Sequence, residues 1–195
     1  MQREARIFWT LIVMLLGASL FFGLGAEVRR REAQQGDTVV LTTGELVTLE
    51  HVLDGDTLMV VKADSSTVVI RLLGIKALDP QHERFGEDAA KALAGYLNGR
   101  SARVRVALTP DGKTKSDRHD RVIAELFVGD KNLGLELVKR GLALVYTPYP
   151  FDSISGYLEQ QGRARDRGAG LWGDSKTARK ADAMLDEWNE RRESE

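Results

Sequence analysis

Hydrophobic and polar positions alternate along several short stretches of the chain, which is the pattern of half-buried β-strands. These stretches are rich in β-branched residues, and most are bounded by Gly or Asp-Gly turns. The stretch 66–75 begins with this alternation and then becomes continuously apolar, as a buried strand would. The pattern predicts strands at 38–49, 57–61, 66–75, 102–108, 121–128 and 143–146.

Apolar residues recur at helical spacing in three other stretches, each of which ends close to a glycine. This spacing predicts helices over 85–98, 133–140 and 154–167. Short strands, glycine turns and one inserted helix are typical of a small closed barrel. We therefore predict a mainly β fold of the α+β class, a five-stranded Greek-key barrel of the OB-fold type with about three helices.

The first 36 residues are set apart by one long apolar segment. Residues 7–26 are 20 residues without a charged side chain, and a helix of that length spans about 30 Å, roughly the hydrocarbon thickness of a bilayer. The apolar region of a signal peptide is usually shorter, about 7–15 residues. We predict a single N-terminal transmembrane helix that anchors the protein in a membrane. The alternative is a cleaved signal peptide and secretion.

The side of the membrane on which the domain lies is predicted only by analogy. Arginines flank both ends of the apolar segment, so the distribution of positive charge does not fix its orientation. An N-terminal anchor ahead of an enzyme-like domain favours a domain outside the cytoplasm.

Charge is nearly balanced in the rest of the chain. The 195 residues carry 28 Lys plus Arg against 29 Asp plus Glu, and residues 37–173, the predicted barrel domain, carry 18 and 19. Because this domain lacks the basic excess that drives non-specific nucleic-acid binding, any phosphate contact must come from a local cluster. The chain contains no cysteine, which excludes disulfides, thiolate zinc sites and a cysteine nucleophile.

The last segment, 174–195, is predicted to be a charged helical tail. It carries five basic and seven acidic residues. Met184, Leu185 and Trp188 allow one apolar stripe on such a helix. We expect this stripe to pack on the domain.

Several short motifs follow one another along the predicted barrel, and none is specific alone. The first, around Asp54 and Asp56, fits a hairpin turn without any chemistry. In order, the motifs are Asp54-Gly55-Asp56-Thr57, Arg71-Leu72-Leu73-Gly74-Ile75, Phe85-Gly86-Glu87, Asp117-Arg118-His119-Asp120-Arg121, Leu133-Gly134-Leu135-Glu136-Leu137 and Gly168-Ala169-Gly170-Leu171-Trp172. Their order and spacing together resemble the staphylococcal-nuclease (thermonuclease) family along nearly all of residues 45–173.

The resemblance implies a five-stranded barrel with three helices and calcium-dependent hydrolysis of phosphodiester bonds in DNA and RNA. It implies that Asp56 is a metal ligand supported by Asp54, and that the backbone carbonyl of Ala77 is another ligand. A hard cation held by oxygen atoms neutralises charge that develops on the phosphate.

The same resemblance assigns the other groups of the site. Arg71 and Arg121 are the two phosphate-binding arginines, since guanidinium groups grip phosphate oxygens through paired hydrogen bonds. Asp79 stands at the position of the supposed general base, which would take a proton from the attacking water. Tyr146 and Tyr149 lie near the positions at which the family stacks a base, although aromatic residues there also serve packing.

One loop departs from the family pattern. The family has Gly-Ile-Asp-Ala-Pro-Glu where this chain has Gly74-Ile75-Lys76-Ala77-Leu78-Asp79. Asp79 keeps a carboxylate but shortens it by one methylene, roughly 1.5 Å, which disturbs a tuned geometry. Lys76 places an ammonium where the family has a ligand carboxylate. At roughly 4–6 Å and an effective dielectric of about 20, its repulsion with Ca²⁺ is on the order of 6–8 kcal/mol before screening.

Three hypotheses follow. In the first, Lys76 turns away, Asp56 and Asp79 hold Ca²⁺, and the protein is a weakened or altered nuclease. In the second, the Lys76 ammonium supplies the electrostatic role of the cation and phosphate binding needs no metal. In the third, catalysis is lost and the barrel is a module that binds nucleic acid, oligosaccharide or a protein partner. The sequence makes no prediction of oligomeric state.

Overall fold

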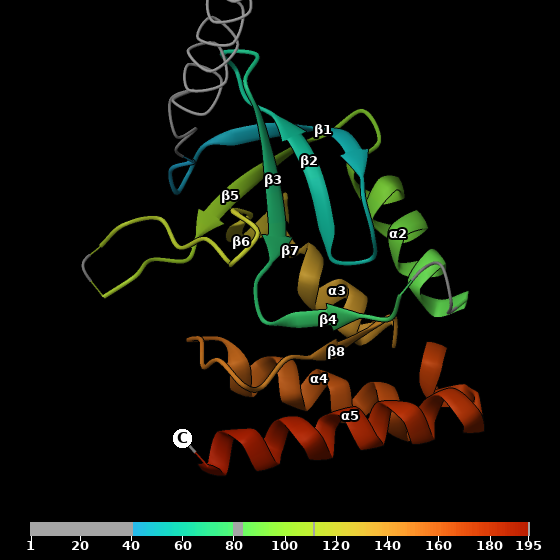
Figure 1. The fold of residues 1–195 in the computed structure, drawn as a ribbon. Coiled ribbons are helices and arrows are strands. Elements are labelled where there is room, and N and C mark those ends of the chain that lie inside the picture. The colour runs from blue at the N-terminus through green and yellow to red at the C-terminus, as the bar shows by residue number, and fades with distance from the viewer. Residues whose placement is uncertain (1–40, 80–83, 111, 195) are drawn as a thin grey trace, which may run out of the picture. The chain divides into compact units, whose positions relative to one another are not determined.

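Five strands close into a barrel in the structure, a computed structural model that describes residues 41–79, 84–110 and 112–194 (Figure 1). The barrel strands are β1 (Leu46–Val52), β2 (Thr57–Val61), β3 (Thr67–Leu72), β5 (Ser101–Val106) and β6 (Val122–Val128). Strands β1, β2 and β3 form an antiparallel meander, and β5 pairs antiparallel with β1 and with β6. A parallel pairing of β3 with β6 closes the ring. The predicted five-stranded barrel and the α+β class are confirmed.

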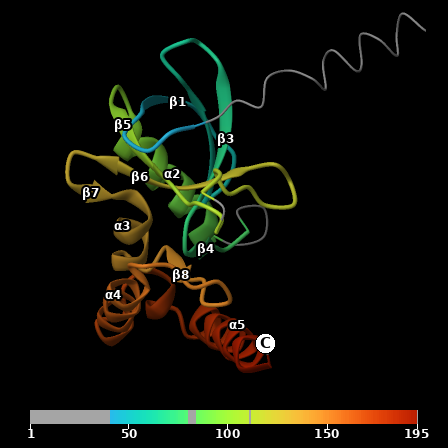
Figure 2. The same cartoon turned by 90° about the vertical axis from the view of Figure 1, so that its left-hand side faces the viewer.

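The described part of the chain contains four α-helices and one short 3₁₀-helix, where about three helices were predicted. The helices are α2 (Arg84–Leu97), α3 (Leu133–Lys139), α4 (Ile154–Asp166), η1 (Gly170–Gly173) and α5 (Ser175–Ser194). The additional α-helix, α5, is the helical tail predicted over 174–195, outside the barrel domain. Figures 1 and 2 show α4 and α5 on the same side of the barrel.

The barrel core follows the alternation in the sequence. In β5, Ala102, Val104 and Val106 are buried and the residues between them are exposed. In α2, Ala89, Leu93 and Leu97 are buried at helical spacing. One side of each of these elements therefore faces the core, as the periodicity predicts.

Three short strands lie outside the barrel ring. Strand β4 (Ile75–Ala77) pairs antiparallel with β8 (Ala143–Val145), and the two-residue β7 (Lys131–Asn132) pairs with the end of β6. The predicted continuous strand 66–75 is wrong at its end, because Gly74 interrupts it with a φ of +72°. The turn at Gly74 directs β4 away from β3 and towards the β1–β2 turn.

Helix α5 packs on the domain through its apolar stripe. Trp188 is 6% exposed, and its ring meets that of Tyr146 edge-on with 4.9 Å between centroids. Met184 and Leu185 are partly buried against the same cluster, which includes Leu171 and Trp172. The predicted packing of this stripe is confirmed.

The predicted transmembrane segment, 7–26, lies outside the described residues. Within the described ranges, no helix has both the length and the apolar character needed to cross a bilayer.

Candidate active site

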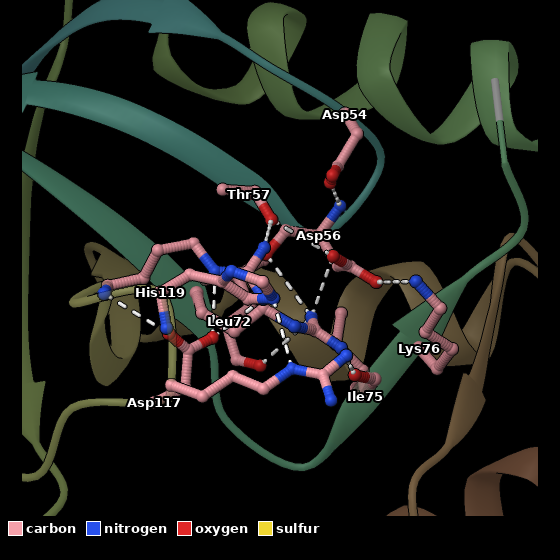
Figure 3. Close-up of polar contacts among 11 residues, drawn as sticks. Asp54, Asp56, Thr57, Leu72, Ile75, Lys76, Asp117 and His119 are labelled. Atoms are coloured by element: carbon pink, nitrogen blue, oxygen red, sulfur yellow. Dashed lines mark hydrogen bonds and ion pairs between the residues drawn. The ribbon is translucent and has the colours of Figure 1, made fainter. Parts of the chain in front are cut away.

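Asp56 is the buried centre of a polar cluster where the β1–β2 turn, β3 and β4 meet (Figure 3). Its side chain is 1% exposed. The backbone N–H of Asp56 donates to Oδ1 of Asp54 at 2.8 Å, and this bond fixes the turn. The local sequence Asp-Gly-Asp thus forms a turn that carries the second carboxylate into the interior.

Each carboxylate oxygen of Asp56 has two donor groups beside it. Oδ1 lies 2.8 Å from Nη1 of Arg71 and accepts a hydrogen bond from Oγ1 of Thr57 at 3.1 Å. Oδ2 accepts a hydrogen bond from the backbone N–H of Ala77 at 2.7 Å and lies 3.6 Å from Nζ of Lys76. A carboxylate offers about four lone-pair directions, so the contacts with Arg71, Thr57 and Ala77 use most of its acceptor capacity, and the Lys76 ammonium lies beside the remainder.

The charge of Asp56 is compensated by the protein itself. Burial raises the pKa of Asp56 above its ordinary value, and the positive charges of Arg71 and Lys76 oppose that shift. A buried carboxylate is costly without such partners. The two cations are therefore a structural requirement of this carboxylate as well as candidate ligands for an anion.

Arg71 connects the end of β3 to β4. Its Nη2 donates to the carbonyl of Ile75 at 2.6 Å, and its Nη1 donates to the carbonyls of Asp56 and Leu72 at 3.3 and 3.4 Å. The side chain is 14% exposed. Most of this guanidinium is therefore engaged by the fold, and only a small part reaches the surface.

Arg121, which comes directly before β6, is held by Asp117 and Thr57. Its Nε and Nη2 lie 2.8 and 2.6 Å from Oδ2 of Asp117. Its Nη1 donates to Oγ1 of Thr57 at 2.9 Å, and that hydroxyl in turn donates to Asp56. Thr57 thereby links Arg121 to the cluster around Asp56.

Asp117 orients Arg121 as an ionised partner. Burial acts against its ionisation, but hydrogen bonds from the Arg121 side chain and from the backbone N–H groups of His119 and Arg121 lower the pKa of Asp117 below its ordinary value. The carboxylate therefore stays charged, and this fixes the guanidinium plane.

Lys76 is the most exposed of the three cations. Its side chain is 43% exposed, compared with 14% for Arg71 and 26% for Arg121. An ammonium carries three N–H donors, and Asp56 is the carboxylate beside it in the structure, as Figure 3 shows. Lys76 is therefore the cation with the greatest access to a ligand from solvent.

The structure brings most of the predicted site residues together. Asp54, Asp56, Arg71 and Arg121 lie in one network, and Ala77 joins it through its N–H, whereas the resemblance implied a role for its carbonyl. Asp79 is exposed two residues after β4.

The two tyrosines predicted near the site differ in burial. Tyr146 is partly buried against Trp188. Tyr149 is 59% exposed, and Nζ of Lys115 lies 5.4 Å from the centre of its ring.

Sequence reasoning missed two members of the network, Thr57 and Asp117. Thr57 ends the motif Asp54-Gly55-Asp56-Thr57, and Asp117 begins the motif that ends at Arg121. Their roles depend on contacts between residues far apart in the chain, such as the 2.9 Å bond from Arg121 to Thr57. Spacing alone carries no signal for these roles.

The donor set does not fit a calcium ion. Calcium takes six to eight oxygen ligands, and the described residues contain no group of three or more His, Cys, Asp or Glu side chains that could hold a metal. A cation at Asp56 would also have to displace the Ala77 N–H and lie beside the Lys76 ammonium. As arranged, the cluster favours an anion over a cation.

Comparison with known protein families finds the same family that the order of the motifs indicates. The family described as staphylococcal nuclease homologue matches residues 69–174, a little more than half of the chain. This chain belongs to the staphylococcal nuclease family. The match includes Arg71, Lys76, Asp79 and Arg121, and α5 lies beyond its end.

Relatives in the staphylococcal nuclease family bear nuclease names. An uncharacterized endonuclease of Haemophilus influenzae is 34% identical over 122 residues, which are 63% of each chain. The thermonuclease of Staphylococcus intermedius is 28% identical over 131 residues, 66% of this chain and 77% of its own. A probable endonuclease of Pyricularia oryzae is 30% identical over 121 residues. The chain spans 63% of the Haemophilus protein and 44% of the Pyricularia protein.

Proposed function

We propose that this protein is a nuclease that binds the phosphodiester backbone of DNA or RNA at the Asp56 cluster and hydrolyses it. The Asp56 cluster is the set Asp56, Thr57, Arg71, Lys76 and Arg121. The observation that carries the proposal is the pairing of two cationic side chains, Arg71 and Lys76, with one buried carboxylate, to which Thr57 links a third cation, Arg121, in a chain of the nuclease family. Nuclease relatives support nucleic acid as the substrate.

The arginines supply electrostatic stabilisation in this proposal. A phosphodiester gains negative charge on its non-bridging oxygens when water attacks phosphorus. Arg121 has five N–H donors, and Asp117 and Thr57 engage three of its nitrogens without using all of these donors. The guanidinium is held in place before substrate arrives, so little ordering cost falls on the reaction.

Asp79 is the carboxylate that we assign to the attacking water. The water oxygen forms a bond to phosphorus while the bond from phosphorus to the leaving sugar oxygen breaks. The proton of the water passes to the Asp79 carboxylate, and the leaving oxygen takes up a proton from solvent.

Cleavage of single-stranded DNA and RNA by the full chain tests this proposal. Replacing Arg121 with Lys removes the bidentate donors, and we expect the cleavage rate to fall about a hundredfold. Arg103→Lys, at an exposed position of β5, is the matched control and should leave the rate unchanged. Equal rates for the two variants would contradict the assignment of Arg121.

A second candidate is a module that binds nucleic acid without cleaving it. It is favoured by the occupied acceptor positions of Asp56 and by the shortened carboxylate at Asp79. Measurement of binding and cleavage on the same labelled oligonucleotide separates the two. Binding that is lost in Arg121→Ala, together with no cleavage by the wild-type chain, would favour the module.

We also propose that residues 7–26 anchor the protein in a membrane with the nuclease domain outside the cytoplasm. Support comes from the length of the uncharged segment. Fractionation of cells that express the full chain should find it in membranes, and external protease should digest the domain in spheroplasts. Recovery of a shortened soluble chain from the medium would favour a cleaved signal peptide.

A further inference from the structure

Lys76 is held near Asp56 but is not enclosed. Its Nζ lies 3.6 Å from Oδ2 of Asp56, longer than a hydrogen bond, and its side chain is 43% exposed. Its ammonium is therefore attracted electrostatically to the carboxylate, while its N–H donors remain accessible to a ligand. Arg71 lies beside the other oxygen of the same carboxylate, so the two cations are neighbours at one site.

Charge arithmetic compares this site with the family pattern. An aspartate carries one negative charge and a bound calcium ion carries two positive charges, so together they contribute a single positive charge. The Lys76 ammonium also contributes a single positive charge. The site with Lys76 and no metal therefore carries the same local charge as the family's aspartate with calcium bound, and a calcium ion beside Lys76 would add two positive charges.

The neighbours of Lys76 agree with the metal-free state. Oδ2 of Asp56 already accepts the Ala77 N–H at 2.7 Å, and Oδ1 faces Arg71 and Thr57. These contacts use the oxygens that a metal would need. The negative charge of Asp56 is thus balanced by protein cations alone, and Lys76 is the more exposed of its two cationic partners.

We propose that the Lys76 ammonium replaces the divalent cation of the family, so that this protein binds phosphodiesters without metal. The inference rests on the proposed function, because it concerns the same site and substrate. Lys76 contacts a non-bridging phosphate oxygen directly, and Asp56 positions the ammonium.

The test uses fluorescence anisotropy of a fluorescein-labelled oligothymidylate with the full chain, once with chelator and once with millimolar calcium. The wild-type Kd should agree within about twofold between the two conditions. Lys76→Gln should weaken binding about tenfold or more in both, since it removes a charge-assisted contact. Lys76→Asp should bind weakly with chelator and regain affinity with calcium.

Lys139→Gln is the matched control. Lys139 is 38% exposed and pairs with Glu136 at 2.8 Å, so the substitution removes a similar ion pair outside the Asp56 cluster. It should leave the Kd unchanged. Circular dichroism checks that each variant is folded, and the comparison of wild-type protein with and without calcium needs no variant at all.

The outcomes separate this inference from the proposed function. Wild-type protein that binds DNA only with calcium would overturn the inference and leave the proposed function standing. Wild-type protein that binds DNA in neither condition would overturn both. Lys76→Gln that binds with chelator as tightly as Lys139→Gln would also overturn the role of the ammonium.

Discussion

Gly55 allows Asp56 to be buried next to Ala77. A Cβ atom at position 55 would lie 2.5 Å from the Cβ of Ala77 and 2.7 Å from the Cβ of Ala89. Neither alanine has a flexible side chain that could move aside. The turn that carries Asp56 therefore packs against β4 and α2 without space for a side chain.

Gly55→Ala should destabilise the protein by about 1–3 kcal/mol, because the added methyl overpacks this contact. Urea unfolding measures the change. The control is Gly95→Ala in α2, where a Cβ would meet nothing within 4 Å. That substitution should be neutral or stabilise the protein by up to about 1 kcal/mol through helix propensity. A stability of Gly55→Ala equal to wild type would contradict the packing.

Individual residues of the site could be predicted only where a motif fixes them. The order of motifs located Asp54, Asp56, Arg71 and Arg121, and the structure places them in one network. Thr57 could not be assigned in the same way. Its role as a link between Arg121 and Asp56 exists only once β3 has paired with both β2 and β6 and so brought Thr57 close to Arg121.

Polar side chains connect β6, α3 and α4 at the N-terminus of α3. Oδ1 of Asn132 caps α3 by accepting from the N–H of Leu135 and also accepts from the Tyr157 hydroxyl at 2.9 Å. Its Nδ2 donates to Oε1 of Glu125 at 2.7 Å. One asparagine thus joins three elements.

Alkaline pH should weaken this connection between elements. Burial, and then the negative charge of Glu125, raise the pKa of Tyr157 well above its ordinary value. The unfolded chain therefore loses this proton first, so the contribution of Tyr157 is complete below about pH 10 and declines as the pH rises above it.

Tyr157→Phe should flatten the loss of stability above about pH 10, at a cost of about 1 kcal/mol at neutral pH from the lost hydrogen bond. Thermal unfolding across the alkaline range provides the measurement. Tyr149→Phe, at an exposed position, should follow the wild-type curve. Parallel curves for wild type and Tyr157→Phe would refute the coupling.

Elements were predicted well where one periodicity governs a stretch. Strand β2 and helix α2 lie within one residue of their predicted limits. The end of β3 was missed because Ile75 and Ala77 are apolar in β4 as they would be in β3, so hydrophobicity does not record the turn. Gly74 is the only local signal of the turn. Its φ is +72°, and the ring of Phe151 occupies the space that a Cβ atom at this position would need.

Gly141 and Gly170 also have a structural role that a local sequence pattern cannot predict. They follow the predicted helices 133–140 and 154–167, and both have positive φ. In the structure, a Cβ at Gly170 would also collide with the backbone of Arg140 and Gly141. This close approach joins residues far apart in the chain, so no local pattern contains it.

At the scale of the whole molecule, near-neutral charge separates this protein from general nucleic-acid binders. The chain has a formal net charge of −1. Under the proposed function, its phosphate contacts are therefore limited to a local cluster of three cations, Arg71, Lys76 and Arg121. Long-range attraction contributes little to binding in this account.

The salt dependence of DNA binding should accordingly be shallow. With about three phosphate contacts on single-stranded DNA, a plot of log affinity against log salt concentration should have a slope of roughly −2. Anisotropy titrations in a series of sodium chloride concentrations measure it. A slope steeper than about −4 would imply a wider basic surface than the structure offers.

Calcium titration by isothermal calorimetry tests most directly whether Lys76 has replaced the cation of the family. The full wild-type chain should give no binding heat with calcium chloride, and Lys76→Asp should give saturable heat, because it restores a carboxylate beside Asp56. Saturable binding of calcium to the wild-type chain, as tight as binding to Lys76→Asp, would contradict the account.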